Sequence, residues 1–358
     1  MVDSTEAAAP SAWPQIDRSF SKRAVFLISI VFYGVILPLN WVLTRLGFHS
    51  VLVSVMNRAG ARGRFEKVFE GYAPTDGDVF VCTFAKSGTN WMMQIAHQIA
   101  FRGAGEYAHI HDVISWPDML TRRRRSMAIP LTDVRVREAS PTKRRVIKTH
   151  LAARFVPYDE KARYLVVVRD PKEVLVSSYH FAAGVAGPLM PTLDTWLELF
   201  LTKSFPFNFG STWAEHTAGY WALKDKPNVL VLFFADMKRD LPGAVEQVAA
   251  VLGVRLTSAE LHAVIERSTF SYMSGIEHKF TPIPSGALPW GHGLKMMRSG
   301  NSGRSDELLS VEQQRRIDAH FAEELAQLGS DFPYSRFTGS DVSTLERHGR
   351  KSATEVPA

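Results

Sequence analysis

The sequence contains very little cysteine and no spacing typical of a metal site. Cys82 is the single cysteine among 358 residues, so no disulfide can form within the chain. A lone cysteine indicates a reducing compartment. No Cys/His cluster has the spacing of a zinc site, and no internal repeat is present. We therefore expect a protein of a reducing compartment that holds no metal.

Charge is missing from one long stretch near the N-terminus. Residues 24–44 contain no Asp, Glu, Lys or Arg, whereas Lys22 and Arg23 precede them and Arg45 follows. A stretch of this length can span a bilayer, and Trp41 suits an interfacial anchor. The alternative is an apolar helix that packs on the soluble domain as a lid.

The segments on either side complete this N-terminal region. Residues 1–21 are small, polar and proline-containing, which predicts disorder. A second apolar run, residues 51–56, can lie along a membrane surface. We therefore expect residues 22–64 to associate with a membrane through contacts within residues 24–56. More basic residues follow the uncharged stretch than precede it, which favours a cytoplasmic catalytic domain.

The remaining composition limits the fold and the partner only broadly. At 46% hydrophobic residues, the chain can bury one large α/β core or two small ones. A formal net charge of +6 is equally compatible with nucleic acid, an anionic membrane or a phosphorylated cofactor. The basic run 122–125 is typical of a solvated loop, with a lipid-headgroup or nucleic-acid contact as the alternative. The motifs below point to a phosphorylated small molecule, so we expect no nucleic acid.

A strand, a tight turn and a helix follow one another within residues 79–100. The first six residues are an apolar run typical of a buried parallel strand, Gly88 breaks the run, and apolar residues then recur at helical spacing. The free N–H groups and the positive dipole end of a helix start attract anions. Lys86 adds a full charge, and Ser87 and Thr89 add hydroxyl donors. This pattern predicts a phosphate cradle.

The loop differs from the P-loop of purine nucleotide hydrolases. That motif needs a glycine where Thr83 stands and a lysine after its second glycine, whereas Lys86 precedes Gly88 here. The order Lys-Ser-Gly-Thr-x-Trp instead resembles the loop with which sulfotransferases bind 3′-phosphoadenosine 5′-phosphosulfate (PAPS). The resemblance implies that Trp91 stacks on the adenine. It also implies that the 5′-phosphate is held by Lys86, Ser87, Gly88, Thr89 and Asn90.

Two further segments resemble motifs of the same family. Lys148-Thr149-His150-Leu151 resembles the segment that carries the catalytic base, which implies that role for His150. Residues 169–181 closely resemble the element that grips the 3′-phosphate. This resemblance implies that Arg169 and Ser177 contact the 3′-phosphate, and an arginine fork suits a phosphate better than a lysine does.

Two motifs nearer the C-terminus resemble the parts that enclose the nucleotide. Residues 268–273 resemble the family's Thr-Ser-Phe-x-x-Met adenosine segment, and residues 297–303 resemble its Arg-Lys-Gly-x-x-Gly motif at the 3′-phosphate. Ser299 replaces the lysine of that motif, so a charge contact is lost there, although Arg304 can compensate. The cofactor contacts that these resemblances imply are Ser268, Phe270, Met273, Arg298, Ser299 and Gly300.

The order of apolar runs predicts the fold class. Four such runs alternate with helical patterns: residues 79–84, 145–149, 164–168 and 229–234. They predict an α/β, P-loop-like three-layer fold in which a central parallel sheet is flanked by helices and binds the cofactor at its carboxyl edge. The resemblance covers roughly residues 72–335. We expect a sulfotransferase domain over residues 65–338 and a loose tail over residues 339–358.

The expected chemistry follows from these residues. Sulfuryl transfer is similar to phosphoryl transfer and passes in line between two oxygens through a loose transition state. His150, with an ordinary pKa of about 6.5, suits the removal of the acceptor proton. Lys86 would stabilise the leaving oxygen and Lys148 the transferring oxygens. The sulfuryl group carries less charge than a phosphoryl group, so a metal is dispensable.

The expected acceptor is an apolar or amphiphilic hydroxyl compound such as a phenol, a sterol or a lipid alcohol. The Phe-rich region 181–209 is predicted to wall an apolar pocket, and a bilayer would concentrate such compounds near the enzyme.

Two other classes of protein stay open for this chain. A P-loop nucleotide kinase or NTPase would need Mg²⁺ ligands, and an inactive, membrane-tethered protein could retain the fold. The inactive class is disfavoured by four intact residues: Lys86, Lys148, His150 and Arg169.

Overall fold

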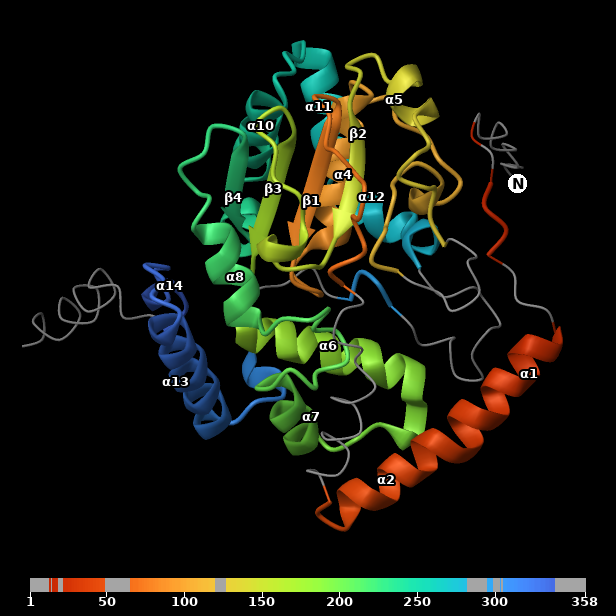
Figure 1. Ribbon diagram of the computed structural model, residues 1–358, viewed down its shortest axis with the longest axis vertical. Coiled ribbons are helices and arrows are strands. Elements are labelled where there is room, and N and C mark those ends of the chain that lie inside the picture. The colour runs from red at the N-terminus through yellow and green to blue at the C-terminus, as the bar shows by residue number, and fades with distance from the viewer. Residues whose placement is uncertain are drawn as a thin grey trace, which may run out of the picture.

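Four parallel strands form the sheet at the centre of the protein (Figure 1). In this computed structural model they run in the order β2-β1-β3-β4, and every pairing is parallel. The strands are β1 Asp78–Thr83, β2 Arg145–Thr149, β3 Arg163–Val168 and β4 Val229–Phe233. All four predicted strands and their parallel arrangement are confirmed, with ends that differ from the prediction by one residue at most.

The structure describes residues 13, 15–18, 22–48, 65–119, 127–281, 295–298, 303 and 305–338. Several predictions concern residues outside these ranges, so the structure does not bear on them. They are the second apolar run 51–56, the basic run 122–125, the contacts of Ser299 and Gly300, and the tail 339–358.

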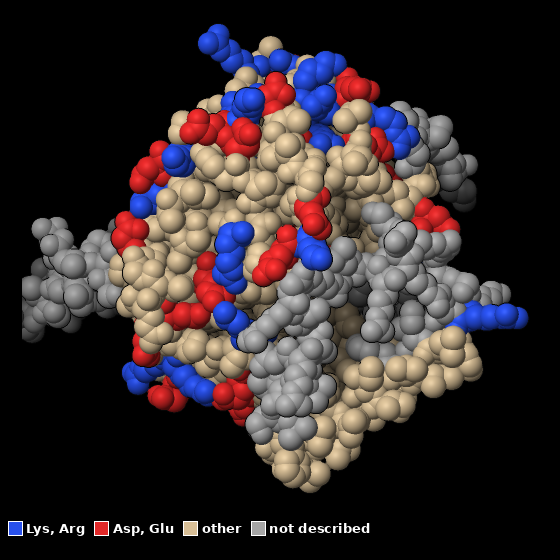
Figure 2. All heavy atoms as spheres, viewed as in Figure 1, with Lys and Arg blue, Asp and Glu red and all other residues tan. Residues whose placement is uncertain are grey.

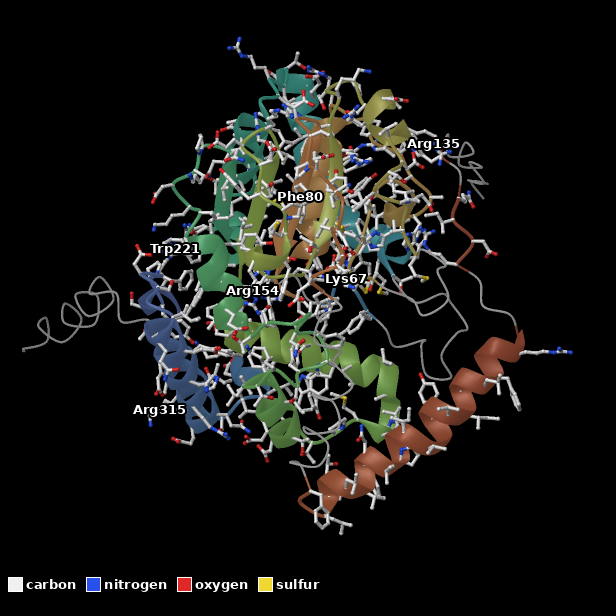
Figure 3. The ribbon with its side chains drawn as sticks, viewed as in Figure 1. Lys67, Phe80, Arg135, Arg154, Trp221 and Arg315 are labelled. Atoms are coloured by element: carbon white, nitrogen blue, oxygen red, sulfur yellow. The ribbon has the colours of Figure 1, made fainter. Side chains whose placement is uncertain are left out.

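Alternate side chains of each strand pack on opposite faces of the sheet. Phe80 and Cys82 join the hydrophobic cluster on one face, whereas Val79 and Val81 join the cluster on the other. Phe80 lies in the middle of the sheet (Figure 3), is fully buried and stacks on Tyr164 with ring centroids 5.1 Å apart. Because both faces are covered, most strand residues are apolar, as in other parallel sheets, and Asp78, Arg145 and Arg163 are the first residues of their strands.

Helices cover both faces and complete the three predicted layers. The hydrophobic cluster of the first face includes side chains of α6 Pro171–Ala186, α7 Leu193–Phe200, α8 Trp213–Trp221 and α13 Val311–Gln327. Of these, α6 and α7 lie beyond the carboxyl ends of the strands (Figure 1). The second face carries α4 Thr89–Ala100, α10 Leu241–Leu252, α11 Ser258–Arg267 and α12 Phe270–Gly275. Shorter elements are η2 Ile110–Asp112, α5 Arg135–Ala139, η3 Ala153–Phe155, η4 Gly187–Leu189, α9 Phe234–Arg239, η5 Glu277–Phe280, η7 Ser305–Glu307 and α14 Ser335–Thr338.

A buried ion pair holds together the starts of β1 and β2, at the edge of the sheet away from the carboxyl ends. The guanidinium Nε of Arg145 lies 2.7 Å from Oδ1 of Asp78, and both side chains are almost fully buried. The other carboxylate oxygen accepts hydrogen bonds from the Tyr72 hydroxyl and the Thr75 backbone N–H. Buried charges of this kind need such full pairing, because an unpaired one is costly.

The uncharged N-terminal stretch forms a helical rod outside the three layers (Figure 1). Helix α1 Lys22–Val31, π-helical turn η1 Phe32–Ile36 and helix α2 Leu37–Arg45 follow one another without a break. The π turn ends two residues before Pro38, which has no N–H to donate to the preceding turn. Within the described residues, no single helix combines the length and the apolarity needed to cross a membrane.

One face of the rod packs on the domain and the other faces outward. Tyr33 and Leu37 are buried against Ala186, and the Tyr33 hydroxyl donates to the Val185 carbonyl at 3.0 Å. The outward face is apolar, and Figure 2 shows little charge along it. Its large side chains are 43–64% exposed: Phe26, Leu27, Ile30, Val31, Val35, Ile36, Leu39, Val42 and Leu46.

The described residues before the rod, 13 and 15–18, include three that contact the domain surface. The Trp13 indole donates to the Glu106 carbonyl at 3.0 Å, and the Ile16 N–H donates to Asp112 at 3.1 Å. Arg18 forms an ion pair with Asp112 at 2.8 Å. Within the range 1–21 that is predicted to be disordered, the structure describes residues 13 and 15–18, and their partners lie about 90 to 110 residues away in the sequence. The prediction for the range as a whole stays a prediction.

Candidate active site

The predicted phosphate cradle lies between the end of β1 and the start of α4. Gly88 has a φ of +97°, which favours glycine, and a Cβ atom there would lie 2.8 Å from the Phe234 ring. Lys86 also has a positive φ, of +70°. This tight turn directs the backbone into the first turn of α4, whose free N–H groups attract anions. The predicted strand, turn and helix are thus present.

The inside of the turn contains a buried hydroxyl without a partner. Ser87 is fully buried, and its Oγ has no hydrogen-bond partner among the described residues. By contrast, Thr83 and Thr89 satisfy each other through hydroxyls 2.6 Å apart. A buried unpaired hydroxyl at a helix start is expensive unless a ligand oxygen pairs with it. The Ser87 hydroxyl therefore fits a phosphate in the cradle.

A cavity of about 750 Å³ opens beside this turn at the carboxyl edge of the sheet. It brings together most of the residues singled out from the sequence, from every motif. Those that line it are Lys86, Gly88, Thr89, Asn90, Trp91, Lys148, His150, Arg169, Ser177, Phe270, Met273 and Arg298. Ser87 and Ser268 are fully buried and do not line the cavity, although Ser268 accepts a hydrogen bond from a residue that does.

His150 is held in a defined orientation at the end of β2. Its Nδ1 lies 2.8 Å from the carbonyl oxygen of Thr83. A carbonyl oxygen only accepts hydrogen bonds, so Nδ1 carries the proton and Nε2 keeps its lone pair. Burial, together with the nearby Lys148 charge, holds the pKa of His150 well below its usual value. The imidazole is thus neutral near pH 7, as a proton acceptor must be.

Two lysines with lowered pKa values stand near this histidine. Burial lowers the pKa of Lys86 to about 7, with a further contribution from Arg169. Burial likewise lowers the pKa of Lys148 to about 7. The Lys86 ammonium lies 4.2 Å from the ring centre of Phe181, and that of Lys148 lies 3.2 Å from the ring centre of Trp116. Both ammonium groups are thus held against aromatic faces.

The two arginines singled out at the 3′-phosphate each pair with a carboxylate. Arg169 Nε lies 2.8 Å from Glu173 Oε2, and its guanidinium stands 4.4 Å from the ring centre of Phe234. Arg298 Nη2 lies 2.5 Å from Glu307 Oε1. Both arginines line the same cavity, so an anion bound there must share or replace their carboxylate partners.

The side chains predicted to enclose adenosine form a second wall of the cavity. The Trp91 indole N–H donates to the Ser268 carbonyl at 2.8 Å, and its ring meets Phe234 edge to face at 5.5 Å. Phe270 is 46% exposed, whereas Met273 is buried. The hydrogen bond fixes the Trp91 ring at one end, and the stacking of this ring on adenine stays a prediction.

Several lining residues were not singled out from the sequence. Trp116 and Met119 come from the loop before β2, whereas Glu173 and His180 lie on α6. Phe207 and Phe209, within the predicted Phe-rich wall, do line the cavity. His109 and His111, in and next to η2, do not line it. His109 caps η2, and His111 stacks on Trp116 at 5.1 Å. Among described residues, no cluster of three or more His, Cys, Asp or Glu suits a metal.

Comparisons with known proteins agree with this arrangement. The family described as sulfotransferase domain matches residues 76–329. The amine sulfotransferase of Oryctolagus cuniculus is 31% identical over 267 residues, which cover 72% of this chain and 82% of that protein. Sulfotransferase 1C2 of Homo sapiens is 27% identical over 252 residues, covering 67% and 80% respectively.

Two solved structures share the fold at low sequence identity. Retinol dehydratase in complex with androsterone and the inactive cofactor PAP has a TM-score of 0.56 at 18% identity, covering 78% of this chain and 88% of that chain. Mouse sulfotransferase SULT7A1 complexed with PAP has a TM-score of 0.52 at 23% identity, covering 73% and 89%. These likenesses confirm the predicted fold class.

Proposed function

Because this chain belongs to the sulfotransferase family and is a PAPS-dependent sulfotransferase, we propose that the cavity beside the turn is its active site. The observation that carries this proposal is the position of His150, whose fixed tautomer presents Nε2 at a cavity shared with the cradle. The proposed 5′-phosphate contacts are the cradle residues Lys86, Ser87, Gly88, Thr89 and Asn90. The orphaned Ser87 hydroxyl supports this assignment.

Three residues of this chain act on different atoms during sulfuryl transfer. His150 Nε2 removes the proton of the acceptor hydroxyl as its oxygen attacks sulfur. A new oxygen–sulfur bond forms while the bond between sulfur and the 5′-phosphate oxygen breaks. Lys86 stabilises the negative charge that develops on this leaving oxygen, and Lys148 stabilises the transferring oxygens. The bound donor supplies the sulfuryl group, and 3′-phosphoadenosine 5′-phosphate (PAP) leaves.

The remaining site residues would read the nucleotide. Arg169, Ser177 and Arg298 line the cavity and suit the 3′-phosphate. Trp91, Phe270 and Met273 line its second wall and suit adenosine, with Ser268 placing the Trp91 indole. Ser299 and Gly300 remain proposed contacts on the family motif alone.

We propose that the acceptor is an apolar or amphiphilic alcohol or phenol. Support comes from the aromatic side chains at the His150 end of the cavity, where Phe209 lies 4.8 Å from the imidazole and Trp116 lies 5.7 Å from it. Phe181 and Phe207 line the same cavity. Such a wall favours an acceptor whose hydroxyl is its main polar group.

A screen with ³⁵S-labelled PAPS tests the function. Simple phenols, sterols and long-chain alcohols are offered as acceptors, with hexoses as the polar comparison. We expect labelled product from apolar acceptors, and a nucleotide panel in which PAP protects the protein against thermal unfolding better than ATP does. Transfer only to hexoses would overturn the acceptor class. Protection by ATP with Mg²⁺ alone would contradict PAPS use.

We further propose that the outward face of the rod, residues 22–48, rests on a lipid bilayer. The support is the set of exposed apolar side chains among its described residues, together with the lack of charged residues from 24 to 44; this combination is typical of a membrane-contact surface. Arg45, whose guanidinium lies 4.8 Å from the Trp41 ring centre, suits the headgroup region. The domain of residues 65–338 would then face the cytoplasm, in line with the single buried cysteine.

Vesicle flotation tests the membrane proposal. Full-length protein is expected to float with phosphatidylcholine vesicles that contain phosphatidylserine. The quadruple variant Phe26→Ser, Leu27→Ser, Ile30→Ser, Val31→Ser should stay at the bottom of the gradient. The matched control is Val311→Ser, since Val311 is 64% exposed on α13, outside the rod. Flotation of the quadruple variant at the parent level would refute this contact surface.

A further inference from the structure

A loop before β2 runs alongside the catalytic end of that strand. Ser115 forms a parallel bridge with the middle of β2, and the Lys148 N–H donates to the Ser115 carbonyl at 2.8 Å. The loop and the strand run in the same direction, so later loop residues meet later strand residues. Trp116 therefore lies against Lys148, and Asp118 lies against His150.

Asp118 is a buried carboxylate that the sequence motifs did not single out. It is 3% exposed, and its Oδ2 accepts the backbone N–H of His150 at 2.6 Å. Its Oδ1 is buried and has no hydrogen-bond partner among the described residues. Burial raises the pKa of Asp118 to about 6, and the His150 N–H opposes this rise. The group is therefore still mainly ionised at neutral pH, and its charge needs a counter-charge nearby.

Lys148 lies two residues before His150 on β2, and its ammonium stands over the ring of Trp116, two residues before Asp118 in the loop. The two side chains form no direct ion pair, but each charge shifts the pKa of the other group. Burial lowers the pKa of this lysine, whereas the Asp118 carboxylate raises it again and Lys86 lowers it further. Without the carboxylate, burial and the neighbouring cation would both act to discharge Lys148. Among the residues that the structure describes, the other titratable groups that interact with this pair are His109, His111, His150, Cys82 and Tyr220.

We propose that Asp118 is a positioning residue of the sulfuryl-transfer site. Its carboxylate keeps Lys148 protonated, and its hydrogen bond to the backbone fixes the strand end that carries His150. The proposal rests on the role proposed above for Lys148 as the stabiliser of the transferring oxygens. It assigns a second task to the loop whose Trp116 already forms part of the cavity wall.

The variant Asp118→Asn separates charge from hydrogen bonding. The amide oxygen can still accept the His150 N–H, but no negative charge remains. Lys148 must then lose its proton at a lower pH than in the parent. In the pH profile of kcat, the fall on the alkaline side is therefore expected to move to lower pH by about one unit. At pH values above this fall, kcat is then about tenfold lower than in the parent. The parent rate should return as the pH falls toward 6.

Two variants of Lys148 show whether Asp118→Asn changes kcat through this lysine. In Lys148→Gln, adding Asp118→Asn should cause no further loss, because the lysine through which it acts is absent. In Lys148→Arg, whose guanidinium stays protonated, the alkaline limb should be insensitive to Asp118→Asn. Each measurement is made only on variants whose thermal melting is cooperative. Should Asp118→Asn not fold alone, the Lys148→Arg/Asp118→Asn protein is compared with Lys148→Arg.

Three results would overturn the proposal. One is an equal loss of kcat at every pH in Asp118→Asn, which would show that the effect does not act through the protonation of Lys148. Another is the same loss in the Lys148→Gln background, which would show a route other than Lys148. The third is parent-level kcat in Lys148→Gln alone; this removes the lysine from catalysis and thereby refutes the proposed function at this residue together with the inference built on it.

Discussion

Arg298 and Glu307 form a two-pronged ion pair at the cavity, with Nη2 to Oε1 at 2.5 Å and Nη1 to Oε2 at 3.2 Å. The His180 imidazole lies 3.2 Å from the same Oε1. A carboxylate thus engages the guanidinium that the family motif assigns to the 3′-phosphate. Binding of the nucleotide must replace this contact or share it.

Glu307→Gln should therefore strengthen PAP binding. Removing the competing charge frees Arg298 for the phosphate, and partly exposed ion pairs of this kind are worth a factor of about two to five. Isothermal titration of PAP into the variant and the parent measures the change. The matched control is Glu198→Gln, because Glu198 pairs with Arg316 on α13 rather than with a cavity residue. Weaker PAP binding in Glu307→Gln would show that the carboxylate helps to hold the nucleotide.

Arg169→Ala should weaken PAP binding about ten- to a hundredfold. Charge-assisted hydrogen bonds to a phosphate contribute roughly 1.5–3 kcal/mol each, and Glu173 would also lose its partner. AMP, which lacks the 3′-phosphate, serves as the internal control and should lose little affinity. If AMP and PAP weaken equally, Arg169 does not read the 3′-phosphate.

Gly88→Ala should reduce PAP affinity and stability together. The added Cβ would overlap the Phe234 ring, and φ is strongly positive. Gly71→Ala is the control, because Gly71 also has a positive φ, of +74°, but no atom within 4 Å of an added Cβ. Both variants carry backbone strain, so the difference between them reports the steric overlap at the cradle. Equal PAP affinity in the two variants would contradict a closely packed cradle.

Asp78→Asn should destabilise the domain without acting on the chemistry. It leaves the Arg145 charge buried without its partner, and breaking a buried pair costs about 3–5 kcal/mol. Urea denaturation of the variant and the parent measures this loss. The control is Arg135→Gln, whose exposed pair with Asp133 should matter little. A midpoint unchanged in Asp78→Asn would mean that the pair is dispensable.

The sequence was sufficient for the sheet because its four strands are short apolar runs, and apolarity on both faces is what a covered parallel sheet requires. The cradle was predictable for a similar reason, since Gly88 and the charges around it act through neighbours in the chain. Asp118 and Glu307 were not predictable. Their roles depend on partners 32 and 9 residues away in sequence, and neither belongs to a recognisable local pattern.

The N-terminal region also has features that local sequence cannot predict. Residues 24–44 were read correctly as helical and apolar, yet the choice between lid and membrane anchor is not a local property. The structure shows that one face packs on Ala186 while the other stays exposed. Trp13 and Arg18 lie in a segment of disorder-prone composition and are nevertheless held by distant partners.

The proposed mechanism depends most on His150 as the proton acceptor, and a single-turnover measurement of sulfuryl transfer tests this role most directly. Preformed enzyme–³⁵S-PAPS complex is mixed with an excess of an accepted phenol, and the rate of labelled product is followed in the parent and in His150→Gln. We predict a rate lower by about 10² or more, with PAP affinity within about twofold of the parent because His150 is assigned no contact with the nucleotide. A single-turnover rate in His150→Gln close to that of the parent would contradict the account.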